Sequence, residues 1–235
     1  MVDDTRIPLV LLPGSLCDEG IWASQIVALQ DIARCEVITC GAHDSVLAMA
    51  DDVIERVRAP RFALAGFSLG GFVALEIMRR APERVSHLAL LDTSARADHP
   101  GNEPVRRRNI DAFTRGASAE VLEAFADLLH GPSTPVALRE QVRASMDRHG
   151  PNAYVPQQRA MMLRPDARAT LEAVRCPLLI LCGAEDRATP PHLHQEMAAL
   201  APHAMYVELA GIGHMTTLEA PDEVSRAMRR WLNSQ

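Results

Sequence analysis

Short apolar runs alternate with segments of helical period along most of the chain, and this alternation constrains the fold more than any other feature of the sequence. Six runs are predicted to be β-strands, at residues 7–12, 35–40, 62–67, 86–92, 177–182 and 204–209. Most of them are apolar throughout, which is typical of parallel strands buried on both faces of a sheet. Helical patterns separate several of the runs, and another closes the chain at 220–232. This order predicts an α/β fold with a doubly wound, mostly parallel sheet.

One stretch interrupts the alternation. Residues 95–175 contain no convincing strand and show four amphipathic helical patterns instead, with proline–glycine pairs between them. An all-helical block inside an α/β pattern indicates an inserted lid. We therefore expect a core of residues 1–94 and 176–235 that carries a helical lid of residues 95–175. A chain of 235 residues suits one domain with such an insertion.

Composition narrows the possible partners and compartments. The net charge of −6 at pH 7 disfavours nucleic acids and anionic membranes, which favour a basic surface. No run approaches the roughly 18 apolar residues of a membrane span, and the acidic N-terminus indicates a first strand rather than a signal peptide. Five cysteines without a C-x-x-C pair fit reduced thiols. We expect a cytoplasmic monomer or homodimer that acts on a small molecule.

Ser68 carries the main functional signal, because it is the centre of a G-x-S-x-G sequence with Gly66 and Gly70 on either side. A predicted strand ends just before this serine and a predicted helix begins just after it. That context is the one a nucleophile elbow requires, where a sharp turn presents the hydroxyl. The alternative is an ordinary tight turn, since five residues of this kind also arise by chance.

A serine hydroxyl is a weak nucleophile that needs a base, and the base needs an orienting acid. Asp186 follows the fifth predicted strand and is the preferred acid; the adjacent Glu185 stays open, and Asp92 after the fourth strand is the second choice. His214 follows the last predicted strand through a glycine-rich loop and is the candidate base.

The pair His192 and His194 could suggest a metal site, but no cluster supplies a third ligand. A solvated helix end is the preferred interpretation of this pair. We expect neither a metal nor an organic cofactor.

An oxyanion hole requires two N–H donors near the nucleophile. One is expected from the backbone of Leu69, directly after Ser68. The other should come from the loop after the first strand, where Gly14 allows a sharp turn and either Ser15 or Leu16 could supply its N–H. Ser15 is the first choice.

With these motifs in this order, nearly the whole chain resembles the α/β-hydrolase superfamily. The resemblance rests on "LLPG" (11–14), "GFSLGG" (66–71), "LLILCGAEDRATPP" (178–191) and "GIGHMTTLEAP" (211–221). It implies a Ser68–Asp186–His214 triad and a pocket beneath the lid. The chain is most similar to small carboxylesterases, enol-lactonases and C–C-bond hydrolases. One departure is Pro13-Gly14, where the family usually has His-Gly; we expect the oxyanion hole to survive it.

The predicted activity is hydrolysis of a small carboxylic ester through an acyl-enzyme. An enol-lactonase or C–C-bond hydrolase shares the triad, and a ligand-binding protein on the same fold is a third possibility. Arg159 and Arg164 could meet a substrate carboxylate, although ion pairs at the surface or between lid and core are the preferred interpretation. Candidates for the pocket wall are Phe113, Phe125, Leu129, Met146, Met161 and Met162, although the lid's own core is the preferred interpretation of these residues.

Overall fold

A six-stranded parallel sheet forms the centre of the computed structural model, which describes residues 5–40 and 43–234. The strand order is β2-β1-β3-β4-β5-β6. The strands are β1 (Ile7–Leu12), β2 (Ala33–Val37), β3 (Phe62–Phe67), β4 (Val85–Leu91), β5 (Leu178–Gly183) and β6 (Met205–Leu209). The predicted α/β class and its parallel sheet are confirmed. The predicted core also includes residues 1–4, 41–42 and 235, which lie outside the described residues.

The second strand is shifted toward the N-terminus from its predicted position: β2 covers Ala33–Val37 instead of residues 35–40, and it lies at the edge of the sheet. It pairs with β1 from Ile7 opposite Ala33 to Leu11 opposite Val37. Arg34 and Glu36 are exposed along this edge. A search for continuous apolar runs therefore starts too late, since an edge strand does not have to be apolar on both faces.

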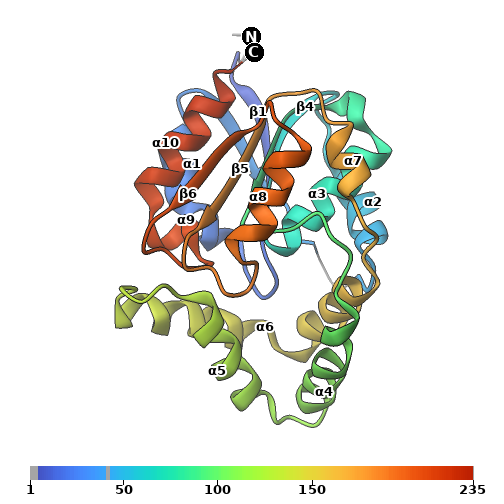
Figure 1. Ribbon diagram of the computed structural model, residues 1–235, viewed down its shortest axis with the longest axis vertical. Helices are drawn as coiled ribbons and strands as arrows, with labels where there is room; N and C mark the ends of the chain where they lie inside the picture. Colours follow the sequence, from blue (N-terminus) through green and yellow to red (C-terminus); the bar gives the residue numbers. More distant parts are fainter. Residues whose placement is uncertain (1–4, 41–42, 235) are drawn as a thin grey trace.

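Helices cover both faces of the sheet. They are α1 (Ala23–Leu29), α2 (Val46–Arg56), α3 (Leu69–Arg80), α4 (Glu103–Thr114), α5 (Ser118–Leu129), α6 (Val136–Leu163), α7 (Arg168–Glu172), α8 (Pro191–Leu200), α9 (Thr216–Glu219) and α10 (Pro221–Leu232), with short 3-10 turns at η1 (Glu19–Trp22), η2 (Pro82–Arg84) and η3 (Pro100–Asn102). Helices α1 and α10 lie together on one face, and α2, α3 and α8 lie on the other (Figure 1).

Successive side chains of a strand pack in two separate apolar clusters, one on each face of the sheet. Leu11 of β1 packs in the cluster that contains Trp231 of α10. Its neighbour Val10 packs in the other cluster, with Met49 of α2 and Val73 of α3. Because side chains alternate across a strand, one apolar run supplies both layers. This explains why the strand sequences are apolar at nearly every position.

Helices α4, α5 and α6 form a band beyond one end of the sheet. This band is at the bottom of Figure 1, and the C-terminal end of α10 is at the top. Helix α6 consists of two segments, because the backbone at Gly150 leaves the helical conformation with φ 60° and ψ −170°. The sequence predicts this break from Gly150-Pro151. Helix α7 packs instead against α3 and α8, beside the sheet.

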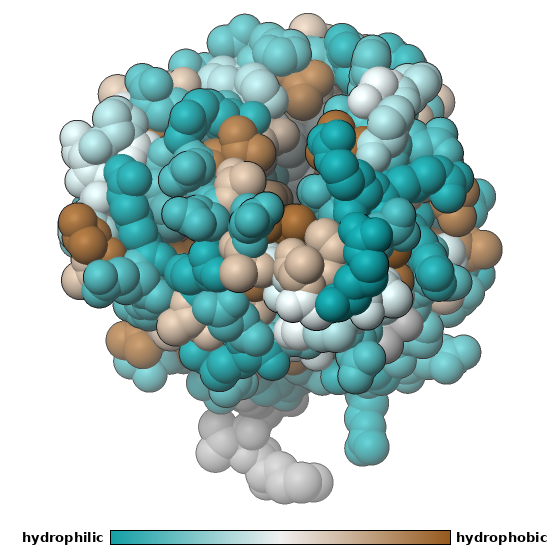
Figure 2. Space-filling model, turned by 90° about the horizontal axis from the view of Figure 1, so that it is seen from below, coloured by the Kyte–Doolittle hydropathy of each residue, from teal (hydrophilic) through white to brown (hydrophobic). Residues whose placement is uncertain are grey.

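The outer face of this band is predominantly hydrophilic, with small separate hydrophobic patches (Figure 2). The exposed large apolar side chains of these three helices are Val105, Leu128, Val136 and Leu163. Scattered apolar residues of this kind are normal on a protein surface. Across residues 5–40 and 43–234, the helices are too short or too polar for a bilayer span.

Candidate active site

Ser68 lies in a sharp turn between β3 and α3, with φ 52° and ψ −114°. Positive φ is uncommon for a residue with a side chain, so the surroundings must hold this conformation. A Cβ at Gly66 would lie 2.3 Å from the carbonyl oxygen of Gly70, and a Cβ at Gly70 would lie 2.3 Å from that of Leu12. Both positions therefore require glycine if the turn is to pack against β1 and its own helix.

The loop after β4 is hydrogen-bonded to this turn and helps to hold its conformation. Thr93 donates its hydroxyl to the Ser68 carbonyl oxygen at 2.8 Å, and its own N–H is donated to Nε2 of His194 at 2.9 Å. His194 is fully buried, and burial lowers its pKa to about 4. The expectation of a solvated helix end at His194 is therefore wrong: its ring faces the sheet and accepts a backbone hydrogen bond.

His214 lies between Ser68 and Asp186, in the loop after β6. Its Nε2 is 3.0 Å from the Ser68 hydroxyl oxygen, and its Nδ1 is 2.8 Å from Oδ2 of Asp186. The three side chains follow the carboxyl ends of β3, β5 and β6, which are parallel strands of one sheet, so the topology brings them to the same edge of the sheet. This hydrogen-bonded chain can move a proton from the serine to the imidazole while the carboxylate fixes the ring.

Four groups hold the Asp186 carboxylate. Its Oδ1 accepts the N–H groups of Ala188 and Thr189 at 2.8 and 2.9 Å, and its Oδ2 accepts the Thr189 hydroxyl at 2.8 Å besides the imidazole. Burial by itself would raise the pKa of this carboxyl. The interaction with His214 and the Thr189 hydrogen bonds outweigh burial and lower the pKa below its usual value. The folded protein thus favours the charged form that an orienting acid needs.

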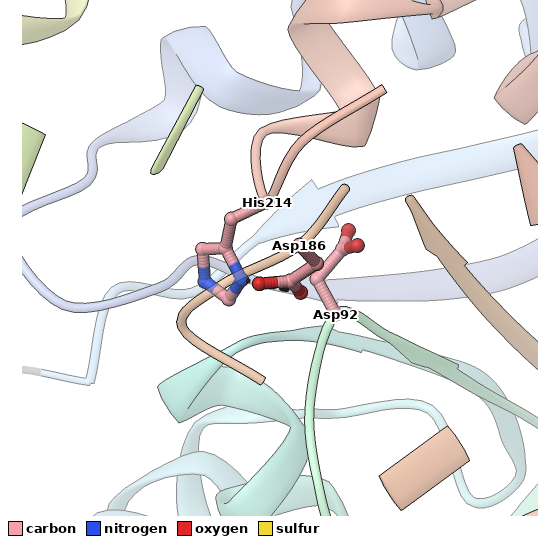
Figure 3. Close-up of side chains that lie close together, drawn as sticks. All are labelled: Asp92, Asp186 and His214. Carbon is pink, nitrogen blue, oxygen red and sulfur yellow. Dashed lines mark hydrogen bonds and ion pairs between the residues drawn. The ribbon is translucent and has the colours of Figure 1, made fainter. Parts of the chain in front are cut away.

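Asp92, the second choice for the acid, points away from the imidazole, whereas Asp186 points toward it (Figure 3). The Asp92 carboxyl accepts the N–H of Gly183 at 3.2 Å and the hydroxyl of Thr216. Burial and the nearby charge of Asp186 raise its pKa well above the usual value. Glu185 is exposed. Of the three acids considered from the sequence, only Asp186 is hydrogen-bonded to His214.

Asp92, Asp186 and His214 offer ligand atoms within 4.8 Å of one another, the one such group among the described residues. The Asp186 oxygen and the His214 nitrogen that face each other are already hydrogen-bonded at 2.8 Å. A separation of 2.8 Å is that of a direct hydrogen bond and leaves no room for a cation between these two atoms.

A cavity of about 220 Å³ opens beside Ser68 and His214. Phe125, Leu129 and Met146 line it, as three of the six predicted wall residues. The others lie elsewhere: Phe113 stacks on Tyr154 with ring centroids 3.7 Å apart, Met161 packs in the cluster with α2 and α3, and Met162 is half-buried outside the cavity lining. Among the helices of residues 95–175, α5 and the first segment of α6 thus contribute to the cavity wall.

The two arginines singled out from the sequence do not line this cavity among the described residues. Arg164 forms an ion pair with Asp98 at 3.0 Å and lies over the Phe72 ring, with its guanidinium carbon 4.3 Å from the centroid. Arg159 is exposed. Arg148 is the arginine at the cavity, and it pairs with Asp18 at 3.2 Å.

The loop after β1 places Ser15 and Leu16 in the cavity wall. Leu16 has φ 56°, and its N–H is donated to Oε1 of Gln157 in α6 at 3.1 Å. Leu69 is the first residue of α3, so its N–H has no acceptor within the helix. Sequence reasoning missed Gln157, because a lone glutamine in an amphipathic helix gives no local signal of what it contacts.

Glu219 is a second residue that the sequence does not reveal. Its carboxylate accepts the N–H of Gly131 at 3.0 Å and the Thr134 hydroxyl, both from the connection between α5 and α6. It also accepts the N–H groups of Gly213 and Met215, at 3.1 and 3.2 Å. The same carboxylate therefore ties the inserted helices to the two residues that flank His214.

Comparisons with known proteins agree with this architecture. The model of the alpha/beta hydrolase family matches residues 9–227. A pimeloyl-(acyl-carrier protein) methyl ester esterase from Chromobacterium violaceum is 30% identical over 207 residues, which cover 83% of this chain and 81% of the esterase. A thermophilic esterase from Thermogutta terrifontis has a TM-score of 0.87 at 29% identity, covering 97% of this chain and 90% of that one.

The enol-lactonase from Burkholderia xenovorans has a TM-score of 0.86 at 20% identity, covering 97% of this chain and 92% of that one, and it shows the fold alone. The family model spans both the sheet and the inserted helices, from β1 to α10. The chain therefore belongs to the alpha/beta hydrolase family.

Proposed function

We propose that this protein hydrolyses a small carboxylic ester, with Ser68 as nucleophile, His214 as general base and Asp186 as the acid that orients the imidazole. The observation that carries the proposal is the unbroken chain of contacts from Ser68 to His214 at 3.0 Å and from His214 to Asp186 at 2.8 Å, beside the cavity. The relatives named as esterases support a hydrolase that acts on ester bonds.

In the first half-reaction the Ser68 oxygen bonds to the ester carbonyl carbon while its proton passes to Nε2 of His214. The tetrahedral intermediate then breaks its bond to the alkoxy oxygen, which leaves with that proton as an alcohol. In the second half-reaction water gives a proton to His214 and attacks the acyl-enzyme, and Ser68 recovers the proton as the acid departs. Asp186 stabilises the charged imidazolium in both halves.

The backbone N–H groups of Ser15 and Leu69 are proposed as the donors to the oxyanion. Ser15 is favoured over Leu16 because the Leu16 N–H is already donated to Gln157 at 3.1 Å. Leu69 begins α3, and the free N–H groups at a helix start favour a negative charge.

Helices α4, α5 and α6 are proposed as the lid, with α7 as part of the core. This narrows the lid expected at residues 95–175, because α7 packs beside the sheet against α3 and α8. The supporting observation is that Phe125, Leu129 and Met146 line the same cavity as Ser68. A cavity of about 220 Å³ suits a short acyl group rather than a large ring system. The cytoplasmic location and the monomer or homodimer stay predictions.

A lactonase or C–C-bond hydrolase would be favoured by a free arginine close to Ser68. Arg148 is the arginine lining the cavity, and Asp18 already neutralises it at 3.2 Å. The ester is therefore the leading substrate class, and lactones belong in the test as the alternative.

Steady-state hydrolysis of a panel tests the proposal. The panel holds methyl and p-nitrophenyl esters of rising acyl length beside simple lactones, and methyl esters are included because the Chromobacterium violaceum relative is named for one. We expect turnover of short esters that disappears in a folded Ser68→Ala variant. Turnover of lactones alone would favour the alternative, and full activity of Ser68→Ala would exclude Ser68 as nucleophile.

A further inference from the structure

Gln157 reaches from the second segment of α6 to the loop after β1. Its Oε1 accepts the Ser15 hydroxyl at 2.8 Å and the Leu16 N–H at 3.1 Å. The Leu16 N–H can only donate, so the side-chain oxygen and not the nitrogen must face the loop. Gln157 is buried, and burial makes an unpaired donor in this loop unfavourable. The contact is therefore specific in both its atoms and its orientation.

The loop that Gln157 contacts is in a strained conformation. Leu16 has φ 56°, a left-handed conformation that a residue with a branched side chain keeps only when its surroundings enforce it. The Leu16 N–H belongs to the peptide group that begins at the Ser15 carbonyl, so the contact fixes the rotation of the chain at Ser15. The Ser15 N–H lies on the preceding peptide group. The bond from the Ser15 hydroxyl to Gln157 at 2.8 Å holds the residue that joins the two peptide groups, so the two bonds together restrict the orientation of both.

We propose that Gln157 is a positioning residue for the oxyanion hole: it holds Ser15 and Leu16 so that the Ser15 N–H points at the substrate carbonyl oxygen. This rests on the proposed function, in which Ser15 donates to the oxyanion. It also means that the second segment of α6 contributes to the chemistry as well as covering the core. Only when that segment is seated does the loop adopt the conformation that stabilises the transition state.

A purely structural role for Gln157 makes a different prediction, and the neighbouring Gln158 provides the control. Gln158 is buried in the same helix, and its Oε1 accepts Nη1 of Arg106 at 2.7 Å instead of contacting the loop. Neither glutamine lines the cavity among the described residues, whereas Ser15 and Leu16 do. If Gln157 only fastened the helix, replacing either glutamine would have the same kind of effect.

The test compares Gln157→Met with Gln158→Met, since methionine keeps the size and helix propensity but removes the acceptor. We expect kcat to fall about 10-fold or more in Gln157→Met, because loss of a whole oxyanion donor costs about 100- to 1000-fold. KM should change little. Gln158→Met should keep nearly the full kcat. The comparison is made between variants that have the same thermal midpoint of unfolding.

Inhibitor affinity separates positioning from general damage. A boronic acid that forms a tetrahedral adduct with Ser68 should lose affinity in Gln157→Met by about the same factor as kcat. The carboxylic acid product of the best ester should not. Equal losses for both inhibitors, or equal effects of Gln157→Met and Gln158→Met on kcat, would overturn the proposal.

Ser15→Ala tests the contact from the loop, because it removes the hydroxyl and keeps the Ser15 backbone N–H. By itself it should lower kcat and boronic acid affinity by the same factor, a result that does not depend on how Gln157→Met folds. We expect a smaller fall in kcat than in Gln157→Met, and no further fall when the two changes are combined, since the bond is then already lost. Additive effects would contradict the proposal. Wild-type protein without ester turnover would refute the proposed function itself, a result distinct from normal wild-type turnover with an unaffected Gln157→Met.

Discussion

At the scale of single residues, strain is concentrated at the edge of the sheet where the candidate active site lies. Within the described ranges, three residues other than glycine have positive φ: Leu16, Ser68 and Asp92, at 56°, 52° and 48°. Each lies in the loop after a different strand, β1, β3 or β4. Such conformations persist where the surroundings enforce them, and they cluster at functional sites. Here the strained turns direct the Ser68 hydroxyl and the backbone of the neighbouring loops toward the candidate active site.

Replacing each buried acid by asparagine distinguishes Asp186 from Asp92. In Asp186→Asn we expect kcat to fall by about a thousandfold or more, because the imidazole loses its orienting charge. Asp92→Asn should keep most of the activity, since the Asp92 carboxyl points away from His214 (Figure 3). Steady-state kinetics on the best ester measures both. Loss of activity in Asp92→Asn with an active Asp186→Asn would reverse the assignment.

The same pair gives opposite dependences of stability on pH. The pKa of Asp186 is lowered by folding, so its contribution to stability is present above the unfolded pKa of about 4 and is lost as the pH falls through the folded value. The pKa of Asp92 is raised, so the folded protein loses stability through Asp92 as the pH rises above about 4. Urea titrations measure the free energy of unfolding of Asp92→Asn and of the wild type at several pH values. The value for Asp92→Asn should rise relative to the wild-type value as the pH rises, and a fall relative to the wild type would contradict this.

At the scale of elements, the inserted helices are held to the core at the loops that carry the chemistry. Gln157 in α6 contacts the loop after β1, and Glu219 joins the α5–α6 connection to the residues beside His214. The backbones approach so closely here that a Cβ at Gly213 would lie 2.3 Å from the Gly131 nitrogen. The position of the insertion is thus coupled to the position of His214, the proposed general base.

Glu219→Gln is expected to weaken this link. The carboxylate accepts four hydrogen bonds, and an amide nitrogen in place of either oxygen would face an N–H donor. We expect a loss of about 1–3 kcal/mol in the free energy of unfolding, with a fall in kcat because His214 is less well held. The control is Glu223→Gln in α10, whose surface pair with Arg226 at 3.2 Å contributes little. Equal effects of the two changes would contradict the role of Glu219.

Sequence reasoning succeeded where the signal is local. The strands and the strand–turn–helix around Ser68 follow from continuous apolar runs and from glycines that leave room for close backbone approach. The start of β2 was missed because an edge strand tolerates the exposed Arg34, which interrupts the apolar run. Phe113 and Met161 were indistinguishable from true wall residues, because the angle at which an amphipathic helix sits on the core is a tertiary property. Gln157 and Glu219 were missed for the same reason.

At the scale of the whole molecule, two apolar clusters build the sheet layers, and side chains of the insertion extend one of them. Leu129 and Met146 belong to the cluster that contains Leu11 and Trp231, and they also line the cavity. The cavity, which is the proposed substrate space, therefore borders the same apolar layer that packs against the sheet. Side chains of the insertion and of the core loops together determine its size.

The acyl-length preference should respond to these side chains. Met146→Ala is expected to enlarge the cavity and to shift the kcat/KM optimum toward longer acyl chains. Met161→Ala is the matched control, because Met161 is buried in the other cluster away from the cavity. It should lower the free energy of unfolding by about 2–5 kcal/mol without shifting the optimum. An optimum that moves in Met161→Ala, or stays fixed in Met146→Ala, would contradict the placement of the cavity.

The central claim is that Ser68 is the nucleophile, and peptide mass mapping after reaction with a fluorophosphonate tests it most directly. We expect one adduct on the peptide that contains Ser68, no adduct in Ser68→Ala, and an unchanged adduct in Ser145→Ala, whose serine also lines the cavity. An adduct on another residue, or ester turnover by the wild type without any adduct on Ser68, would contradict the account.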